Sequence, residues 1–130
     1  MIVDTSVWLA ILFQENDHEL FSEKLKISPI VKVTAPSFLE ATISSVNRLG
    51  KSSINGLNRL FELTNAEVVP FGPEAARLAA KAFLRYGKGQ GHPAQLNFGD
   101  CMVYAACKVE VMPLLFKGDD FTHTDIERAM

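Results

Sequence analysis

The chain has 130 residues, of which 48% are hydrophobic and 22% are charged. These values are typical of one soluble globular domain and leave too little length for two ordinary ones. The net charge of −2 does not indicate a general nucleic-acid-binding protein. No stretch approaches the roughly 20 apolar residues of a membrane span, and the first residues lack the pattern of a signal peptide, so we expect a cytoplasmic protein.

Short apolar segments alternate with helical patterns in the first half of the chain. The predicted elements, in order, are a strand at 2–3, helices at 6–14 and 17–25, and a strand at 30–34. A third helix begins near Pro36, which suits a first turn, and ends at Gly50, which suits a C-terminus. This helix places apolar side chains on one face, namely Leu39, Ile43, Val46 and Leu49. A fourth helix follows the serine pair at 52–53.

The second half of the chain continues the same alternation. The predicted elements are a strand at 67–71, a helix at 74–86, a flexible Gly-rich loop at 87–93, a helix at 98–109 and a strand at 113–116. Alternating strands and helices predict right-handed crossovers and a parallel sheet. We therefore expect one α/β domain over residues 1–130: a three-layer α/β/α sandwich around a mainly parallel sheet of about four to five short strands.

Acidic residues lie where predicted strands end or where helices begin. Asp4 follows the first strand, and Asp119 and Asp120 follow the last. Glu40 and Asp100 lie near helix N-termini. In open parallel sheets, ligands bind beyond the carboxyl ends of the strands, so these acids can meet in one pocket. Clustered carboxylates suit Mg²⁺ or Mn²⁺.

Each acid also has a structural interpretation. Asp100 can simply stabilise a helix N-terminus, and the aspartates at 119 and 120 can belong to a turn. Glu40 lies about 120° around its helix from the apolar face, as an exposed glutamate would. Cys101 and Cys107 do not have zinc-site spacing, and we expect buried free thiols.

Basic residues concentrate between positions 75 and 99, where no acid occurs. The candidates to bind phosphate groups are Arg77, Lys81, Arg85, Lys88 and His92. The first three are four residues apart and share one side of a helix. A solvated helix face explains this stripe as well as a phosphate-binding strip does.

Four ordered segments resemble those of PIN-domain ribonucleases, specifically the VapC toxins of toxin–antitoxin pairs. They are the opening Met-Ile-Val-Asp-Thr-Ser, residues 36–41, residues 97–101 and residues 114–121. The resemblance implies a PIN-like fold in which Asp4 and Asp100 are the principal metal ligands. It also implies that Glu40 and Asp120 complete the catalytic site.

The resemblance leaves some assignments in the site open. Asp119, Thr5 and Ser6 are further candidates to contact the metal or its ligands. Position 119 is often a polar amide in such proteins, and Lys117 replaces a small polar residue that is common there. We therefore favour Asp120 over Asp119 as the fourth acid.

The activity that the resemblance implies is hydrolysis of RNA phosphodiester bonds with one or two Mg²⁺ or Mn²⁺ ions. It further implies a cognate antitoxin that places a basic side chain among the acids, and a homodimer. Trp8, Phe13 and Phe21 are candidate partner contacts, although each also suits the core.

Two other functional classes fit parts of the pattern. A phosphoacceptor signalling domain also holds Mg²⁺ at strand ends and has a lysine after its last strand, where Lys117 stands. Such a domain needs an acidic pair after the first strand, whereas Asp4 stands alone before Thr5. A non-catalytic binding module is the second alternative, in which the acids would only accept basic groups of a partner.

Overall fold

A computed structural model of the chain describes all of residues 1–130. Its sheet has four short strands, namely β1 (Ile2–Val3), β2 (Lys32–Thr34), β3 (Glu67–Val69) and β4 (Leu114–Leu115). Every pairing is parallel, and the strands lie in the order β3-β2-β1-β4. The chain therefore builds outward from β1 to β3 and then returns to the other side of β1. This reversal creates a switch point between β1 and β4.

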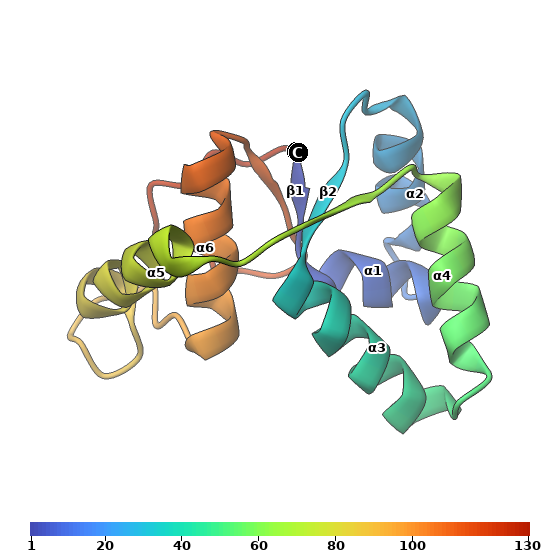
Figure 1. Cartoon of the computed structure of the whole chain (residues 1–130), viewed down its shortest axis with the longest axis horizontal. Helices are drawn as coiled ribbons and strands as arrows, with labels where there is room; N and C mark the ends of the chain where they lie inside the picture. The colour runs from blue at the N-terminus through green and yellow to red at the C-terminus, as the bar shows by residue number, and fades with distance from the viewer.

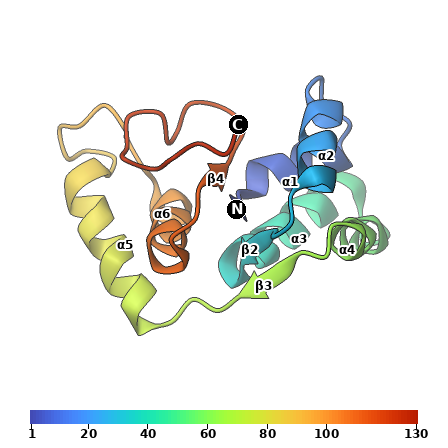
Figure 2. The same ribbon diagram turned by 90° about the horizontal axis from the view of Figure 1, so that it is seen from above.

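Six helices cover the two faces of the sheet. They are α1 (Thr5–Leu12), α2 (His18–Ile27), α3 (Ala35–Leu49), α4 (Ser53–Leu63), α5 (Pro73–Tyr86) and α6 (Phe98–Glu110). Helices α5 and α6 lie on one side of the strands and α1 to α4 on the other (Figures 1 and 2). The predicted sandwich with a parallel sheet is confirmed. No helix is both long and apolar enough to cross a membrane.

The core has two parts, one on each face of the sheet. Ile2 and Leu114 belong to the cluster that includes α5 and α6, whereas Val3 and Leu115 belong to the cluster that includes α1 to α4. Neighbouring residues of a strand point to opposite faces, so both residues of β1 and both residues of β4 are buried. This burial explains why β1 and β4 read as apolar pairs.

Three helices begin with side chains that accept hydrogen bonds from backbone N–H groups. Asp4 is the N-cap of α1, Thr34 of α3 and Asn97 of α6. Because α1 directly follows β1 and α3 directly follows β2, both helices start at the edge formed by the strand C-terminal ends. The residues that start the helices are therefore neighbours of any site at that edge.

The apolar side of α3 is not buried. Leu39, Ile43 and Leu49 are at least half exposed, whereas Ala41 and Ser45 are completely buried. Small residues allow α3 to pack closely, so the helix turns its larger apolar side chains outward. The apolar face of α3 that the residue spacing predicted is therefore exposed to solvent.

Two of the proposed partner contacts are part of the core. Trp8 and Phe21 are buried, and the indole N–H of Trp8 donates to the carbonyl of Val3 at 3.3 Å. They cannot contact a partner in this fold. Phe13 is half-buried, and the guanidinium of Arg48 lies 4.1 Å from its ring centre.

Hydrogen bonds close the base of the Gly-rich loop. Its base is closed by the Lys88 N–H, which donates to the Leu96 carbonyl at 2.9 Å, and by the Leu96 N–H, which donates to Tyr86 at the same distance. Gly89 and Gly91 have positive φ angles of 84° and 73°. The glycines therefore serve tight turns.

Candidate active site

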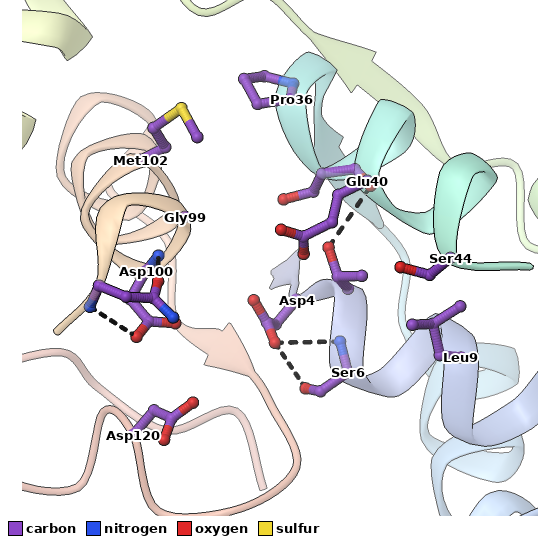
Figure 3. Close-up of a pocket in the computed structure, with 13 residues that line it drawn as sticks. Asp4, Ser6, Leu9, Pro36, Glu40, Ser44, Gly99, Asp100, Met102 and Asp120 are labelled. Carbon is purple, nitrogen blue, oxygen red and sulfur yellow. Dashed lines mark hydrogen bonds between the residues drawn. The ribbon is translucent and has the colours of Figure 1, made fainter. Parts of the chain in front are cut away.

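An acidic pocket lies at the switch point between β1 and β4. The space measures about 260 Å³, and its acidic lining residues are Asp4, Glu40, Asp100 and Asp120. Figure 3 shows these side chains turned toward a common space between α6 on one side and α1 and α3 on the other. The structure thus brings together acids from four separate segments.

Asp4 is fixed by the first turn of α1. One of its oxygens, Oδ2, accepts hydrogen bonds from the backbone N–H of Ser6 at 3.1 Å and from the Ser6 hydroxyl at 2.6 Å. Burial raises the pKa of Asp4, the two Ser6 hydrogen bonds oppose that shift, and the charges of Glu40 and Asp120 add to it. Asp4 is therefore oriented by the protein, but its charge is poorly compensated.

Asp100 is fixed by a reciprocal pair of hydrogen bonds with Asn97. The Asp100 N–H donates to Asn97 Oδ1 at 2.8 Å, and the Asn97 N–H donates to Asp100 Oδ2 at 3.1 Å. Burial, opposed by the hydrogen bond from Asn97, raises the pKa of Asp100 to about 6, and Asp120, Asp4 and Glu40 contribute further. Asn97 was not predicted as a site residue, although the Asn-x-x-Asp spacing is a recognisable capping pattern.

Glu40 reaches the pocket because of its angle on α3. The side chain extends toward the start of α6, where Gly99 lies (Figure 3). A methyl group added to Gly99 would lie 3.3 Å from Glu40 Oε2. Gly99 is therefore a second residue that the sequence analysis missed, since the absence of its side chain makes room for this carboxylate.

The remaining candidates at this edge have distinct places. Thr5 is buried, lines the pocket, and its hydroxyl donates to the carbonyl of Ser37 at 3.4 Å. Asp120 lines the pocket, whereas Asp119 does not. The carbonyl of Asp119 instead accepts a turn hydrogen bond from Thr122 at 3.0 Å. Of the two neighbouring aspartates, Asp120 is therefore the one at the acidic pocket.

The predicted RNA-binding residues do not line the acidic pocket. Arg77, Lys81, Arg85 and Lys88 are all exposed. The His92 ring packs edge-on against Tyr86, with the ring centres 4.9 Å apart, and its Nδ1 accepts a hydrogen bond from the Ala94 N–H at 3.1 Å. His92 therefore organises the loop, and the four cations lie outside the pocket.

The pocket suits a divalent cation by its charge and its donor atoms. Its lining includes no lysine, arginine or histidine that could balance the acids. The acids are not close enough together to form a ready-made ligand cluster, so bound water would have to complete a coordination shell, as is common for Mg²⁺. The hydrogen bonds to Asp4 and Asp100 each engage one carboxylate oxygen and leave the other for a cation.

The raised pKa of Asp100 predicts how stability depends on pH when no metal is present. The folded state retains the proton up to about pH 6, whereas the unfolded state loses it near 3.8. Stability should therefore fall as the pH rises between these values. Asp100→Asn should raise the free energy of unfolding at pH 7.5 by about 1 kcal/mol, less than the full shift would give because water screens the charge.

Urea unfolding in EDTA at pH 4 and pH 7.5 would measure this effect. The difference between the wild type and Asp100→Asn should nearly vanish at pH 4, where the folded wild type is already protonated. Asp119→Asn is the matched control and should show no such gain, because Asp119 lies outside the pocket. A less stable Asp100→Asn at pH 7.5 would contradict the electrostatic account.

Comparison with known proteins identifies the family. A family model for the PIN domain matches residues 1–127. The VapC ribonuclease Mb2780c of Mycobacterium bovis is 42% identical over 130 residues, which cover 99% of this chain and 98% of that protein. Ribonuclease VapC28 of Mycobacterium tuberculosis is 40% identical over 130 residues, which cover 100% of this chain and 98% of that protein.

Solved structures show the same fold at low sequence identity. The sarcin-ricin loop cleaving toxin VapC20 of Mycobacterium tuberculosis aligns with a TM-score of 0.79 at 16% identity, over 96% of this chain and 95% of its own. FitAcB of Neisseria gonorrhoeae aligns with a TM-score of 0.74 at 18% identity, over 98% and 94% of the two chains. With the family match and the relatives at about 40% identity, the conclusion is that this chain belongs to the PIN-domain family and, within it, to the VapC ribonucleases.

Proposed function

We propose that the protein is a metal-dependent endoribonuclease that hydrolyses RNA phosphodiester bonds and acts as the toxin of a toxin–antitoxin pair. The observation that carries this proposal is the pocket in which Asp4, Glu40, Asp100 and Asp120 meet without any basic side chain. The ribonuclease names of relatives at about 40% identity support the same activity.

In this proposal, Asp4 and Asp100 hold one or two Mg²⁺ or Mn²⁺ ions, and Glu40 and Asp120 complete the site. A bound ion of this kind supplies an activated water and stabilises charge on the scissile phosphate. The protein contributes orientation. Ser6 fixes the carboxylate of Asp4, Asn97 fixes that of Asp100, and the glycine at position 99 leaves room for Glu40.

The basic residues of α5 and of the loop that follows it would contact RNA away from the cleavage point. Arg77, Lys81, Arg85 and Lys88 remain candidates for phosphates that flank the bound segment, since none of them lines the pocket. Contacts of this kind position a nucleic acid without reading its sequence, and their loss would weaken binding more than catalysis.

The phosphoacceptor alternative is not favoured. It requires a lysine that reaches the acidic pocket after the last strand. The ammonium of Lys117 instead pairs with Glu15 and with Asp17, the latter at 3.0 Å. Asp4 also has no acidic neighbour in sequence.

Neutralising a principal ligand tests the proposed activity. Asp4→Asn and Asp100→Asn should each lower Mn²⁺-dependent cleavage of cellular RNA by at least the roughly 100-fold that changes around a metal site can reach. Both variants should fold, and expression of either should no longer arrest growth. Asp119→Asn should keep the activity. Cleavage by the Asp100→Asn variant at the wild-type rate would exclude the proposed site.

Gly99→Ala tests whether the free space at position 99 allows the Glu40 carboxylate to take its position in the pocket. The added methyl group should displace this carboxylate by a few tenths of an ångström and lower cleavage by about three- to tenfold, because small misplacements at a reacting centre are costly. Gly56→Ala in α4 is a matched control, since its methyl group would lie 3.3 Å from Leu12 Cδ1, outside the acidic pocket. Equal activities of the two variants, measured at equal folded fraction, would contradict this role.

We further propose a cognate antitoxin. One structural relative, which aligns with a TM-score of 0.70, is a toxin–antitoxin complex from Klebsiella pneumoniae. An antitoxin that places a basic side chain among the four acids would supply the charge that the pocket lacks. This idea predicts that the partner and Mn²⁺ compete for the protein, which a metal-binding titration with and without the partner would measure.

We also propose that the protein forms a homodimer through an exposed apolar surface beside the acidic pocket. This surface comprises Leu39 and Ile43 of α3, Phe83 and Leu84 of α5, and Phe98 of α6. Phe98 is 81% exposed and Leu84 is 71% exposed. Contiguous apolar patches of this kind mark interaction sites.

Light scattering at micromolar concentration would measure the oligomeric state. The wild type should be a dimer, and Phe98→Asp should shift it toward a monomer because a charge would then lie in the apolar contact. Leu63→Asp is the matched control, since Leu63 is 65% exposed and lies on α4, outside this surface. A monomeric wild type would remove the dimer from the proposal.

A further inference from the structure

Lys117 connects the segment after β4 with the loop between α1 and α2. Its ammonium pairs with the carboxylates of Glu15 and Asp17, and the second distance is 3.0 Å. Each of the three side chains is about two thirds buried, with exposed fractions of 33% to 36%. The contact therefore joins two loops that are far apart in the sequence.

The backbone of Lys117 makes a second connection, directly to the acidic pocket. Its N–H donates to the hydroxyl oxygen of Ser6 at 3.0 Å, and that hydroxyl donates to Asp4 at 2.6 Å. The same residue thus touches α1 through its main chain and the end of the α1–α2 loop through its side chain. Two anchor points on one residue limit its movement relative to Asp4.

The segment that Lys117 anchors also carries Asp120. Gly118 follows immediately with a φ of 91°, so the chain turns sharply there. Asp119 does not line the pocket, whereas Asp120 does. The position of the fourth acid therefore depends on where residue 117 is held.

We propose that Lys117 is a positioning residue that fastens the Asp120 segment to α1 and thereby sets the spacing between Asp4 and Asp120. This inference rests on the proposed metal-dependent function. The ammonium binds Glu15 and Asp17 and so does not neutralise the pocket. Through this pairing, Lys117 supports a cation site without occupying it.

The Lys108–Asp125 pair provides a comparison within the same protein. Lys108 Nζ lies 2.9 Å from Asp125 and ties the C-terminal segment to α6. The two side chains are 36% and 45% exposed, close to the values in the Lys117 contact. Neither residue lines the acidic pocket. Loss of this pair would therefore remove an ion pair of similar exposure without moving an acid of the site.

Four variants separate the positioning role from a general effect on folding. Lys117→Met removes the charge and keeps the backbone donor to Ser6, while Lys117→Arg retains the charge. The double variant Glu15→Gln with Asp17→Asn removes the partners and leaves the lysine. Lys108→Met is the matched control.

The measurements are Mn²⁺ binding by electron paramagnetic resonance, hydrogen exchange of the amides in residues 117–121 without metal, and melting temperature. Lys117→Met and the double variant should raise the Mn²⁺ concentration for half-saturation by about tenfold, as outer-shell changes around a metal typically do. Both should also speed exchange in residues 117–121. Lys117→Arg should remain near wild type, and Lys108→Met should change only the melting temperature.

The inference would be overturned if Lys117→Met and Lys108→Met bound Mn²⁺ with the same half-saturation concentration and showed the same hydrogen exchange in residues 117–121. If Lys117→Met does not fold, the double variant decides the question by the same measurements. A wild type that binds Mn²⁺ but does not cleave RNA would refute the proposed ribonuclease and leave the positioning role testable. If the wild type binds no Mn²⁺, the exchange of residues 117–121 alone decides.

Discussion

The burial of several uncompensated carboxylates in one pocket is the constraint on which the site depends. Burial is the main cause of the raised pKa values of Asp4 and Asp100, and the negative charges of the neighbouring acids add to it. The protein opposes these effects with helix starts. Asp4 lies at the N-terminus of α1 and Asp100 in the first turn of α6, where the backbone N–H groups favour a negative charge. The same hydrogen bonds hold each side chain in one orientation, so stabilisation and positioning have a common source.

The parallel sheet provides the places that these helix starts occupy. Because β1 lies between β2 and β4, the segments that follow all three strands emerge at one edge. One of them carries Asp4, another Glu40 on α3, and the third Asp120. Helix α6 approaches from the opposite face of the sheet and adds Asp100 (Figure 2). The site therefore combines both layers of helices, and its geometry depends on the packing of each layer against strands of only two or three residues.

The sequence pattern predicted the place of a site residue well where that residue directly follows a strand. The apolar segments at 2–3 and 113–116 predicted β1 at its observed bounds and β4 to within one residue at each end, and so predicted the neighbourhood of Asp4 and Asp120. Helical spacing was less informative about direction. It grouped Arg77, Lys81 and Arg85 on one side of α5, but the relation of that side to the pocket depends on how α5 packs. Likewise, the apolar spacing in α3 did not predict exposure, because buried small residues such as Ala41 make the close contact. The pairing of Lys117 with Glu15 and Asp17 has no local signature at all.

The charge distribution also indicates the order in which metal and RNA would bind in the proposed reaction. An acidic pocket without basic side chains repels an RNA phosphate, whereas a pocket that holds one or two divalent ions attracts it. Metal must therefore bind before the scissile phosphate enters. The cations of α5 cannot replace the metal in this role, since they are exposed and lie outside the pocket, and salt screens exposed charges over about 8 to 10 Å. In the proposed reaction, their role would be limited to holding RNA near the surface. Binding and cleavage of RNA would then belong to separate parts of the molecule, and metal in the acidic pocket would determine whether bound RNA is cut.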